Sequence, residues 1–259
     1  MTGFESPEGA AVQTGIARLD SNGGALHRGC VTLLAGAPGM GKSTMAINMA
    51  LSAREPQGAA AGYFTSFYEN GDLLLRLFAT VSGVEPSRSS LRGQGSAGFT
   101  ELVKRWDLHL FPVGGLVLQH EAVAEGTQQA LAHSPGLALV VVDPVHTNSA
   151  SAQYGKEDRR RTLCGFQELA REHNVAVLLV TALDRSLLDG EGMKPGLGHL
   201  RRRGLDLELF DTVLLLHRPA HYTPRAPPQL AELVVHRIAS GEQRLVTLQV
   251  KRDGLSFEG

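Results

Sequence analysis

Short runs of consecutive apolar residues alternate along this chain with longer segments of helical character. Two of these runs, 137–142 and 175–181, are apolar from end to end except for Thr181. A strand with apolar side chains on both faces is typical of a parallel sheet that lies between two layers of helices. The sequence therefore predicts an α/β fold with a mainly parallel, twisted sheet flanked by helices.

The remaining elements follow from the same alternation. The other predicted strands are 31–35, 62–66, 108–111, 212–216, 232–236 and 245–250. The predicted helices are 42–53, 71–81, 119–133 and 157–173. The last two strands are joined by the six residues 238–243, which favours an antiparallel hairpin at the sheet edge. Residues 1–12 are expected to form a flexible tail, and 13–259 a single domain.

Charge and cysteine content exclude several classes of protein. The chain has 25 basic and 26 acidic residues, so it is not a globally basic nucleic-acid binder, although local patches remain open. Cys30 and Cys164 stand far apart and form no CxxC motif, which argues against a disulfide framework and suits a reducing cytoplasm. No apolar run approaches the length of a membrane span, so we expect a cytoplasmic protein without a membrane partner.

The strand 31–35 and the helix 42–53 are joined by GAPGMGKS, which matches the pattern G-x-x-x-x-G-K-[ST]. Glycines in such a loop allow backbone N–H groups to turn towards phosphate oxygens, and the helix N-terminus adds its positive end. The lysine reaches the β and γ phosphates, and the hydroxyl that follows it can ligate Mg²⁺. The predicted ATP and Mg²⁺ contacts are Gly36, Ala37, Pro38, Gly39, Met40, Gly41, Lys42, Ser43 and Thr44.

A carboxylate later in the chain also supports a metal site. Asp143 directly follows the apolar strand 137–142. A carboxylate at the carboxyl end of a parallel strand can hold the Mg²⁺ shell beside the phosphates. We therefore predict that Ser43 and Asp143 are the metal-binding residues and that Lys42 and Asp143 take part in catalysis.

Several longer stretches resemble RecA-like ATPases, and in particular the C-terminal motor domain of DnaB-type replicative helicases. The segment 14–36 before the phosphate loop carries the opening pattern, which KaiC and RadA proteins share. Four later stretches resemble the helicase motifs more specifically: 166–185, 200–204, 211–218 and 232–241. The resemblance covers about residues 13–258 and lacks the family's N-terminal helical domain and linker helix. It implies a RecA-like fold and an ATP-driven motor.

The resemblance leaves the catalytic glutamate open between two positions. A gapless alignment with DnaB places Phe67 there, whereas a KaiC-like alignment places Glu69 there. Glu69 is the carboxylate that can orient the attacking water, and its alternative role is to cap the next helix. Arg76 matches an arginine of the family's nucleotide pocket, or it is a surface residue.

Two family positions carry alanine in this chain. The sensor glutamine corresponds to Ala182, and the finger arginine of the final hairpin corresponds to Ala239. Arg237 stands where the family has lysine, which makes it the candidate to reach a neighbouring subunit's phosphate, with Arg244 as another. Without such an arginine the resemblance implies slow hydrolysis.

Arg201, Arg202 and Gly204 occupy the family loop that holds the backbone of single-stranded DNA in a central channel. Phosphate contacts need positive charge and reach, which arginine provides. The loop has no aromatic residue on which bases could stack. The alternative is a solvated basic helix face.

Three functions follow from these motifs. The first is a ring-forming, DnaB-like ATPase, expected as a homo-hexamer or other homo-oligomer, that acts on single-stranded DNA in replication. The second is a nucleotide-dependent regulatory or scaffold module with slow or lost hydrolysis. The third is a KaiC- or RadA-like ATPase in repair or signalling.

Overall fold

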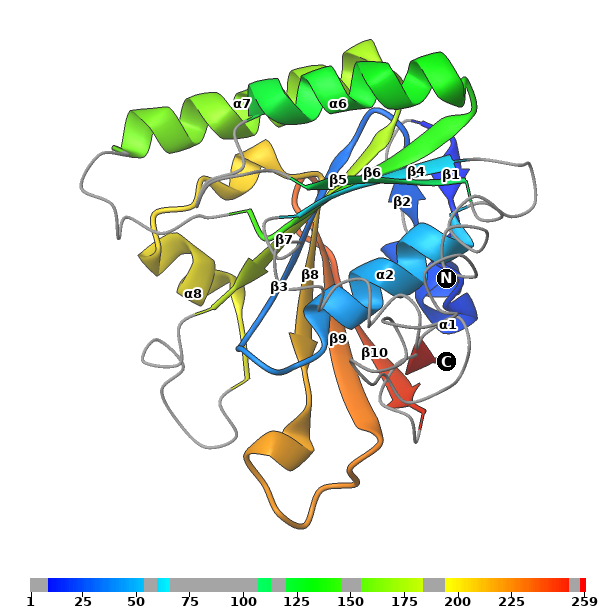
Figure 1. Ribbon diagram of the computed structural model, residues 1–259. Helices are drawn as coiled ribbons and strands as arrows, with labels where there is room; N and C mark the ends of the chain where they lie inside the picture. Colours follow the sequence, from blue (N-terminus) through cyan, green and yellow to red (C-terminus); the bar gives the residue numbers. More distant parts are fainter. Residues whose placement is uncertain are drawn as a thin grey trace.

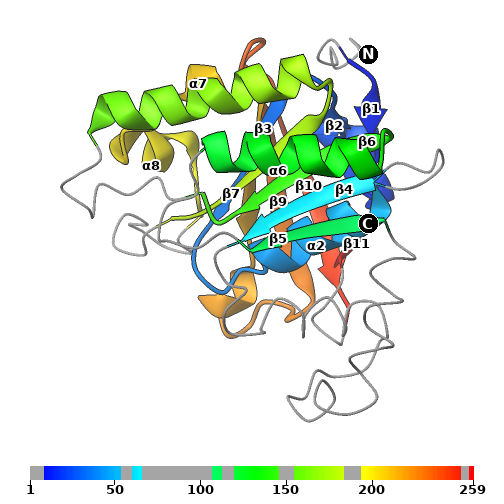
Figure 2. The same cartoon turned by 45° about the horizontal axis from the view of Figure 1, so that its top comes forward.

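The computed structural model describes residues 9–53, 60–65, 107–112, 120–145, 155–183, 194–251 and 257–259. A large sheet runs through this part of the chain, with α2 (Lys42–Ser52) on one face and α6 (His120–His133) and α7 (Lys156–Glu172) on the other (Figure 1). Figure 2 shows α6 and α7 side by side across the sheet. The predicted sheet between two helical layers is therefore confirmed.

The sheet has nine strands in the order β11-β10-β9-β8-β3-β7-β6-β4-β5. The strands from β8 to β5 pair in parallel, whereas β9, β10 and β11 are antiparallel additions. Their bounds are β3 Val31–Gly36, β4 Ala60–Thr65, β5 Leu108–Pro112, β6 Leu137–Asp143, β7 Ala176–Ala182, β8 Thr212–His217, β9 Leu230–Arg237, β10 Gln243–Val250 and β11 Phe257–Glu258. Each predicted strand is present, displaced by at most a few residues.

Burial explains why the central runs are apolar throughout. All seven residues of β6 and all six of β3 are buried, because helices cover both faces of these strands. By contrast, β9 alternates between buried and partly exposed side chains, which is the pattern of a sheet face that no helix layer covers completely. Glycine lets α6 approach the sheet, since a Cβ at Gly126 would lie 2.5 Å from Cε1 of Phe64.

The hairpin of β9 and β10 is confirmed, but it is not the outermost part of the sheet. β11 pairs with the end of β10, with Phe257 opposite Val250. The helix predicted at 71–81 lies outside the described residues. The helices α1 (Ala17–Leu19) and α8 (Leu197–Arg202) and the single-turn segments η1 (Asp20–Gly24), η4 (Leu207–Leu209) and η5 (Pro219–His221) had no counterpart in the predicted elements.

The segment 1–12, which the sequence analysis expects to be a flexible tail, contains a short strand among its described residues. Ala11 and Val12 form β1, which pairs with β2 (Leu26–His27) in a small antiparallel sheet. Val12 is buried because β2 and the main core cover it. Part of the segment 1–12 is therefore a strand, and the boundary between tail and domain stays a prediction. No helix among the described residues is long and apolar enough to cross a membrane.

Candidate functional site

The predicted phosphate loop leaves the sheet at the carboxyl end of β3. Gly39 and Gly41 have φ values of +82° and +93°, which L side chains rarely adopt. A Cβ at Gly36 would lie 2.5 Å from the carbonyl oxygen of Leu216 in neighbouring β8. The glycines therefore meet two requirements, a left-handed backbone within the loop and close contact with the next strand.

Lys42 is the first residue of α2 and is buried, with 8% of its surface exposed. Its Nζ donates a hydrogen bond to the carbonyl oxygen of Ala37 at 2.8 Å, so the side chain folds back into its own loop. Burial lowers the pKa of Lys42 to about 8, and the nearby negative charge of Asp143 opposes that change. An anion that enters the loop would therefore stabilise the charged form of the Lys42 amine.

Asp143 ends β6 at the same edge of the sheet and is only 2% exposed. Its Oδ2 accepts a hydrogen bond from the Tyr63 hydroxyl at 2.6 Å. The edge also holds Gly36 of β3 and Ala182 of β7, which are register partners. Sheet topology thus brings the loop and the carboxylate together, although they are about a hundred residues apart in sequence.

These residues fit a nucleoside triphosphate with Mg²⁺. Mg²⁺ is commonly bound by one or two protein oxygens together with substrate phosphates, so a buried carboxylate and the half-buried Ser43 at the start of α2 are a suitable donor set. The described residues hold no group of three or more His, Cys, Asp or Glu that could bind a metal without such a ligand. A metal ion at this site would therefore need phosphate oxygens as additional ligands.

Two distant segments brace the loop, and the sequence analysis identified neither. The Phe257 N–H donates to Asn48 Oδ1 on α2 at 3.0 Å, and a Cβ at Gly41 would lie 3.1 Å from Cζ of the Phe257 ring. On the other side, the Arg218 N–H is 3.3 Å from Met40 Sδ. The loop is thus held between β11 and the segment that follows β8.

Arg237, the candidate finger residue of the sequence analysis, is buried in this chain, and its role towards a neighbouring subunit stays a prediction. It is 4% exposed, and its Nη1 donates to Thr212 Oγ1 at 2.7 Å while Nη2 lies 3.4 Å from His27 Nε2. Thr212 begins β8, so the guanidinium lies at the opposite end of the sheet from the phosphate loop. The strand alternation of β9 turns this side chain into the core of the chain.

The basic segment, residues 201–204, begins in a helix, whereas the resemblance implies a loop. Arg201 and Arg202 are exposed in the last turn of α8, and Gly204 follows with φ +75°. The Arg203 guanidinium donates to the Ala182 carbonyl at the end of β7. The neighbouring Leu183 N–H donates to the Gly36 carbonyl at 2.9 Å. The basic segment therefore lies at the same end of the sheet as the phosphate loop.

Three positions discussed for the site, Phe67, Glu69 and Arg76, lie outside the described residues, so the assignments of Glu69 and Arg76 remain predictions. Among the described residues, the sequence analysis missed Tyr63, Phe257 and Asn48. Tyr63 had one signal, a hydroxyl-bearing side chain in an apolar strand. Its hydrogen-bond partner, Asp143, follows from the β4–β6 register, in which Tyr63 stands opposite Val141, two residues before Asp143.

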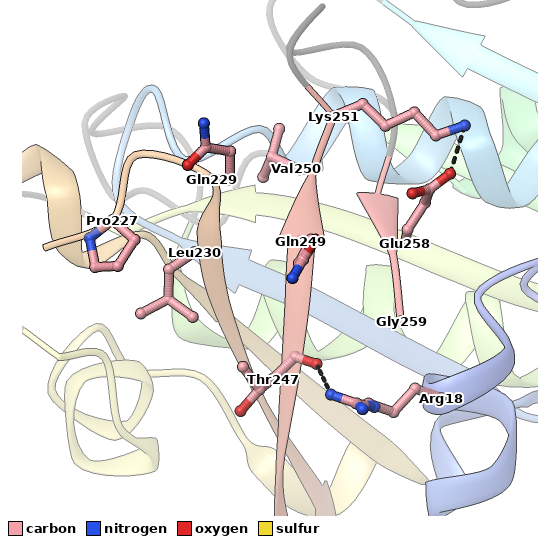
Figure 3. A pocket seen from close by; sticks show the side chains of 10 residues that line it. All are labelled: Arg18, Pro227, Gln229, Leu230, Thr247, Gln249, Val250, Lys251, Glu258 and Gly259. Carbon is pink, nitrogen blue, oxygen red and sulfur yellow. Dashed lines mark hydrogen bonds and ion pairs between the residues drawn. The ribbon is translucent and has the colours of Figure 1, made fainter.

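A cavity of about 640 Å³ beside the C-terminus is a weaker candidate for a site (Figure 3). Its charged side chains are already paired, since Lys251 meets Glu258 at 2.6 Å and Arg18 donates to the Thr247 carbonyl at 3.1 Å (Figure 3). No residue of the phosphate loop lines it. The chemistry of the molecule is therefore better sought at the edge that holds Lys42 and Asp143.

Comparison with known proteins identifies the family of the chain. A family model described as the DnaB-like helicase C-terminal domain matches residues 11–259. A probable plasmid replicative DNA helicase of Chlamydia psittaci is 24% identical over 245 residues, which cover 91% of this chain and 53% of the relative. The chain spans about half the length of the curated relatives it matches.

Two solved structures share the fold. A DnaB-like replicative helicase, described with its interactions with primase, gives a TM-score of 0.79 at 18% identity and covers 98% of this chain and 62% of that one. The RadB recombinase gives a TM-score of 0.64 at 21% identity and covers 95% and 98% of the two chains. The fold is therefore that of RecA-like ATPase domains.

Proposed function

Since the chain belongs to the family of DnaB-like helicase C-terminal domains, we propose that it binds MgATP and hydrolyses it to act on single-stranded DNA. In this proposal Lys42 contacts the β and γ phosphates, Thr44 contacts the α phosphate, and Ser43 and Asp143 hold Mg²⁺. Held by these two residues, Mg²⁺ would neutralise charge that develops on the phosphates. Glu69 orients the attacking water, and Arg76 belongs to the nucleotide pocket.

One observation carries the nucleotide part of the proposal. A buried lysine lies within electrostatic range of a buried carboxylate, beside a loop whose glycines adopt left-handed backbone. Burying two opposite charges is costly unless a ligand or partner uses them. A phosphate chain with Mg²⁺ uses both, since it supplies anionic oxygens to Lys42 and a cation to Asp143.

The exposed arginines of α8 support the DNA part of the proposal. They lie at the nucleotide end of the sheet, and Arg203 ties α8 to β7 beside Gly36. Two hydrogen bonds connect this region to the phosphate loop: Arg203 donates to the Ala182 carbonyl, and the Leu183 N–H donates to the Gly36 carbonyl. We propose that several copies assemble into a ring, as a homo-hexamer, around the strand. Sedimentation velocity with and without nucleotide tests the assembly.

A second candidate function is a nucleotide-dependent regulatory module with slow hydrolysis. The buried position of Arg237, together with alanine at 182 and 239, favours it, because an arginine supplied in trans speeds hydrolysis and Arg244 is then the remaining candidate on this hairpin. ATP turnover of the wild type with and without single-stranded DNA separates the two. Stimulation by DNA supports the motor, and tight binding with negligible turnover supports the module.

The lowered pKa of Lys42 predicts how nucleotide affinity changes with pH. In the free protein this pKa is about 8, and bound phosphates raise it because they stabilise the ammonium. Binding therefore takes up a proton above pH 8, and affinity falls by up to about tenfold per pH unit there. Calorimetry at pH 7 and pH 9, in buffers of different ionisation enthalpy, should show proton uptake at pH 9 alone. Equal affinity at both values would contradict this assignment.

The basic segment predicts a specific salt dependence. The double substitution Arg201→Ala with Arg202→Ala should weaken binding of single-stranded DNA and lower the log–log salt slope by about 1.4, since each lost phosphate contact is worth about 0.7. Nucleotide affinity should stay unchanged. Fluorescence titration of a labelled oligonucleotide at several salt concentrations measures both quantities. Arg171→Ala is the matched control, because this exposed arginine lies at the far end of α7. An unchanged slope in the double variant would identify the arginines as a solvated face.

A further inference from the structure

We propose that Tyr63 is a positioning residue for Asp143: its hydroxyl fixes the orientation in which the carboxylate meets the Mg²⁺ shell. The inference rests on the proposed function of the phosphate loop. It concerns a side chain on a different strand from every residue assigned to that loop, and it adds a second layer to the site.

The contact is short and fully enclosed. Tyr63 is 0% exposed and Asp143 is 2% exposed, and 2.6 Å separates the Tyr63 hydroxyl from Asp143 Oδ2. A hydroxyl that donates to a carboxylate at 2.5–2.7 Å forms one of the stronger hydrogen bonds found in proteins, roughly twice as strong as a neutral one. Because both groups are buried, water does not compete for this bond.

The strand register makes the contact a fixed feature of the sheet. Tyr63 stands opposite Val141 and Thr65 stands opposite Asp143 in the parallel pair of β4 and β6. Tyr63 and Asp143 are thus two register positions apart on adjacent strands, where side chains project from the same face of a sheet. The phenol is long enough to span that offset.

A carboxylate needs such a partner to be held in one orientation. Rotation about the bond to the carboxylate is broad and roughly two-fold, so the strand alone does not decide where the oxygens point. Residues that hydrogen-bond a metal ligand fix its orientation, and their loss typically costs about 10- to 100-fold in metal affinity. An ionised carboxylate has about four acceptor positions, so the bond to Tyr63 leaves capacity for the metal shell.

Lys42 makes this orientation important. Its charge interacts with Asp143, yet its Nζ donates to the Ala37 carbonyl. Because the Tyr63 hydroxyl engages Oδ2, it opposes rotation of the carboxylate towards the ammonium. The lysine then remains directed to phosphate and the aspartate to Mg²⁺.

The test is the Mg²⁺ dependence of nucleotide binding in Tyr63→Phe, which removes the hydroxyl and keeps the ring. Titration of Mg²⁺ into protein with a fluorescent ATP analogue should show a half-saturating concentration about tenfold higher than in the wild type. Binding of the analogue in EDTA should be unchanged. Thr127→Val is the matched control, since it removes a buried hydroxyl that donates to the Val123 carbonyl within α6, at 2.7 Å. It should leave the Mg²⁺ titration at the wild-type value.

Two outcomes separate this inference from the proposed function. If the wild type binds the analogue without any Mg²⁺ dependence, the proposed function fails. If the wild type depends on Mg²⁺ and Tyr63→Phe matches it, Tyr63 has no positioning role.

A second comparison covers the case in which Tyr63→Phe does not fold. Tyr63→Phe combined with Asp143→Asn also removes the carboxylate charge that the phenol hydroxyl contacts in the wild type. Because Tyr63 acts through that charge, the double variant should have the Mg²⁺ dependence of Asp143→Asn alone. A further loss in the double variant would overturn the inference.

Discussion

Lys42→Ala is expected to lower the affinity for MgATP about 100-fold, since a charge-assisted contact to phosphate is worth about 1.5–3 kcal/mol. ATP turnover should fall below detection, because the same ammonium also meets the charge that develops on the γ phosphate. Calorimetry with MgATP and a phosphate-release assay measure the two effects. Arg171→Ala, which removes a positive charge from the far end of α7, should leave both quantities unchanged.

Stability distinguishes loss of this contact from loss of the fold. The pKa of Lys42 is about 8 in the folded protein, below its ordinary value of 10.5, so folding disfavours the charged form. The penalty is fully present below pH 8 and disappears as the pH rises towards 10.5. Lys42→Ala should therefore not lower the thermal midpoint at pH 7 without nucleotide. An unchanged affinity for MgATP in a folded Lys42→Ala protein would refute the site.

Asp143→Asn is expected to reduce Mg²⁺-dependent hydrolysis by about 100-fold or more, because a neutral amide replaces a carboxylate that holds the metal shell. Binding of ATP in EDTA should persist, since the phosphate loop is intact. A single-turnover assay at saturating nucleotide separates slow chemistry from weak binding. Wild-type turnover in this variant would remove Asp143 from the metal site.

The same variant has a second, independent consequence. The charge of Asp143 raises the pKa of Lys42 and partly offsets the effect of burial. Asp143→Asn should therefore move the loss of nucleotide affinity to a lower pH than in the wild type. Calorimetry across pH 6–9 would detect the displacement, and an identical pH profile would mean that the two side chains do not interact.

Much of the fold could be predicted because the signals are local. Continuous apolar runs marked β3, β6 and β7, and the glycine motif marked the junction of β3 and α2. The strand β1 was not predicted, because it is short and is stabilised by pairing with β2. Its two residues carry no periodic signal that could distinguish a strand from a tail.

The site divides in the same way. Lys42 and Asp143 were predictable, since a phosphate loop and a carboxylate at the end of a strand are recognisable without a partner. The burial of Arg237 was not predictable, because it depends on the face of β9 from which the side chain projects. In the structure that face is the core, where Thr212 and His27 surround the guanidinium.

By itself the sequence determined the succession of the strands β3 to β10 along the chain, the residues of the phosphate loop and the place of Asp143 at the end of an apolar strand. The tertiary structure alone decided which distant side chains complete the site. Tyr63 reaches Asp143 because β4 lies beside β6, and Phe257 supports Gly41 because β11 returns to the sheet next to α2. Such contacts depend on strand order and register, which no local pattern encodes, whereas backbone conformation and strand burial leave their mark on neighbouring residues.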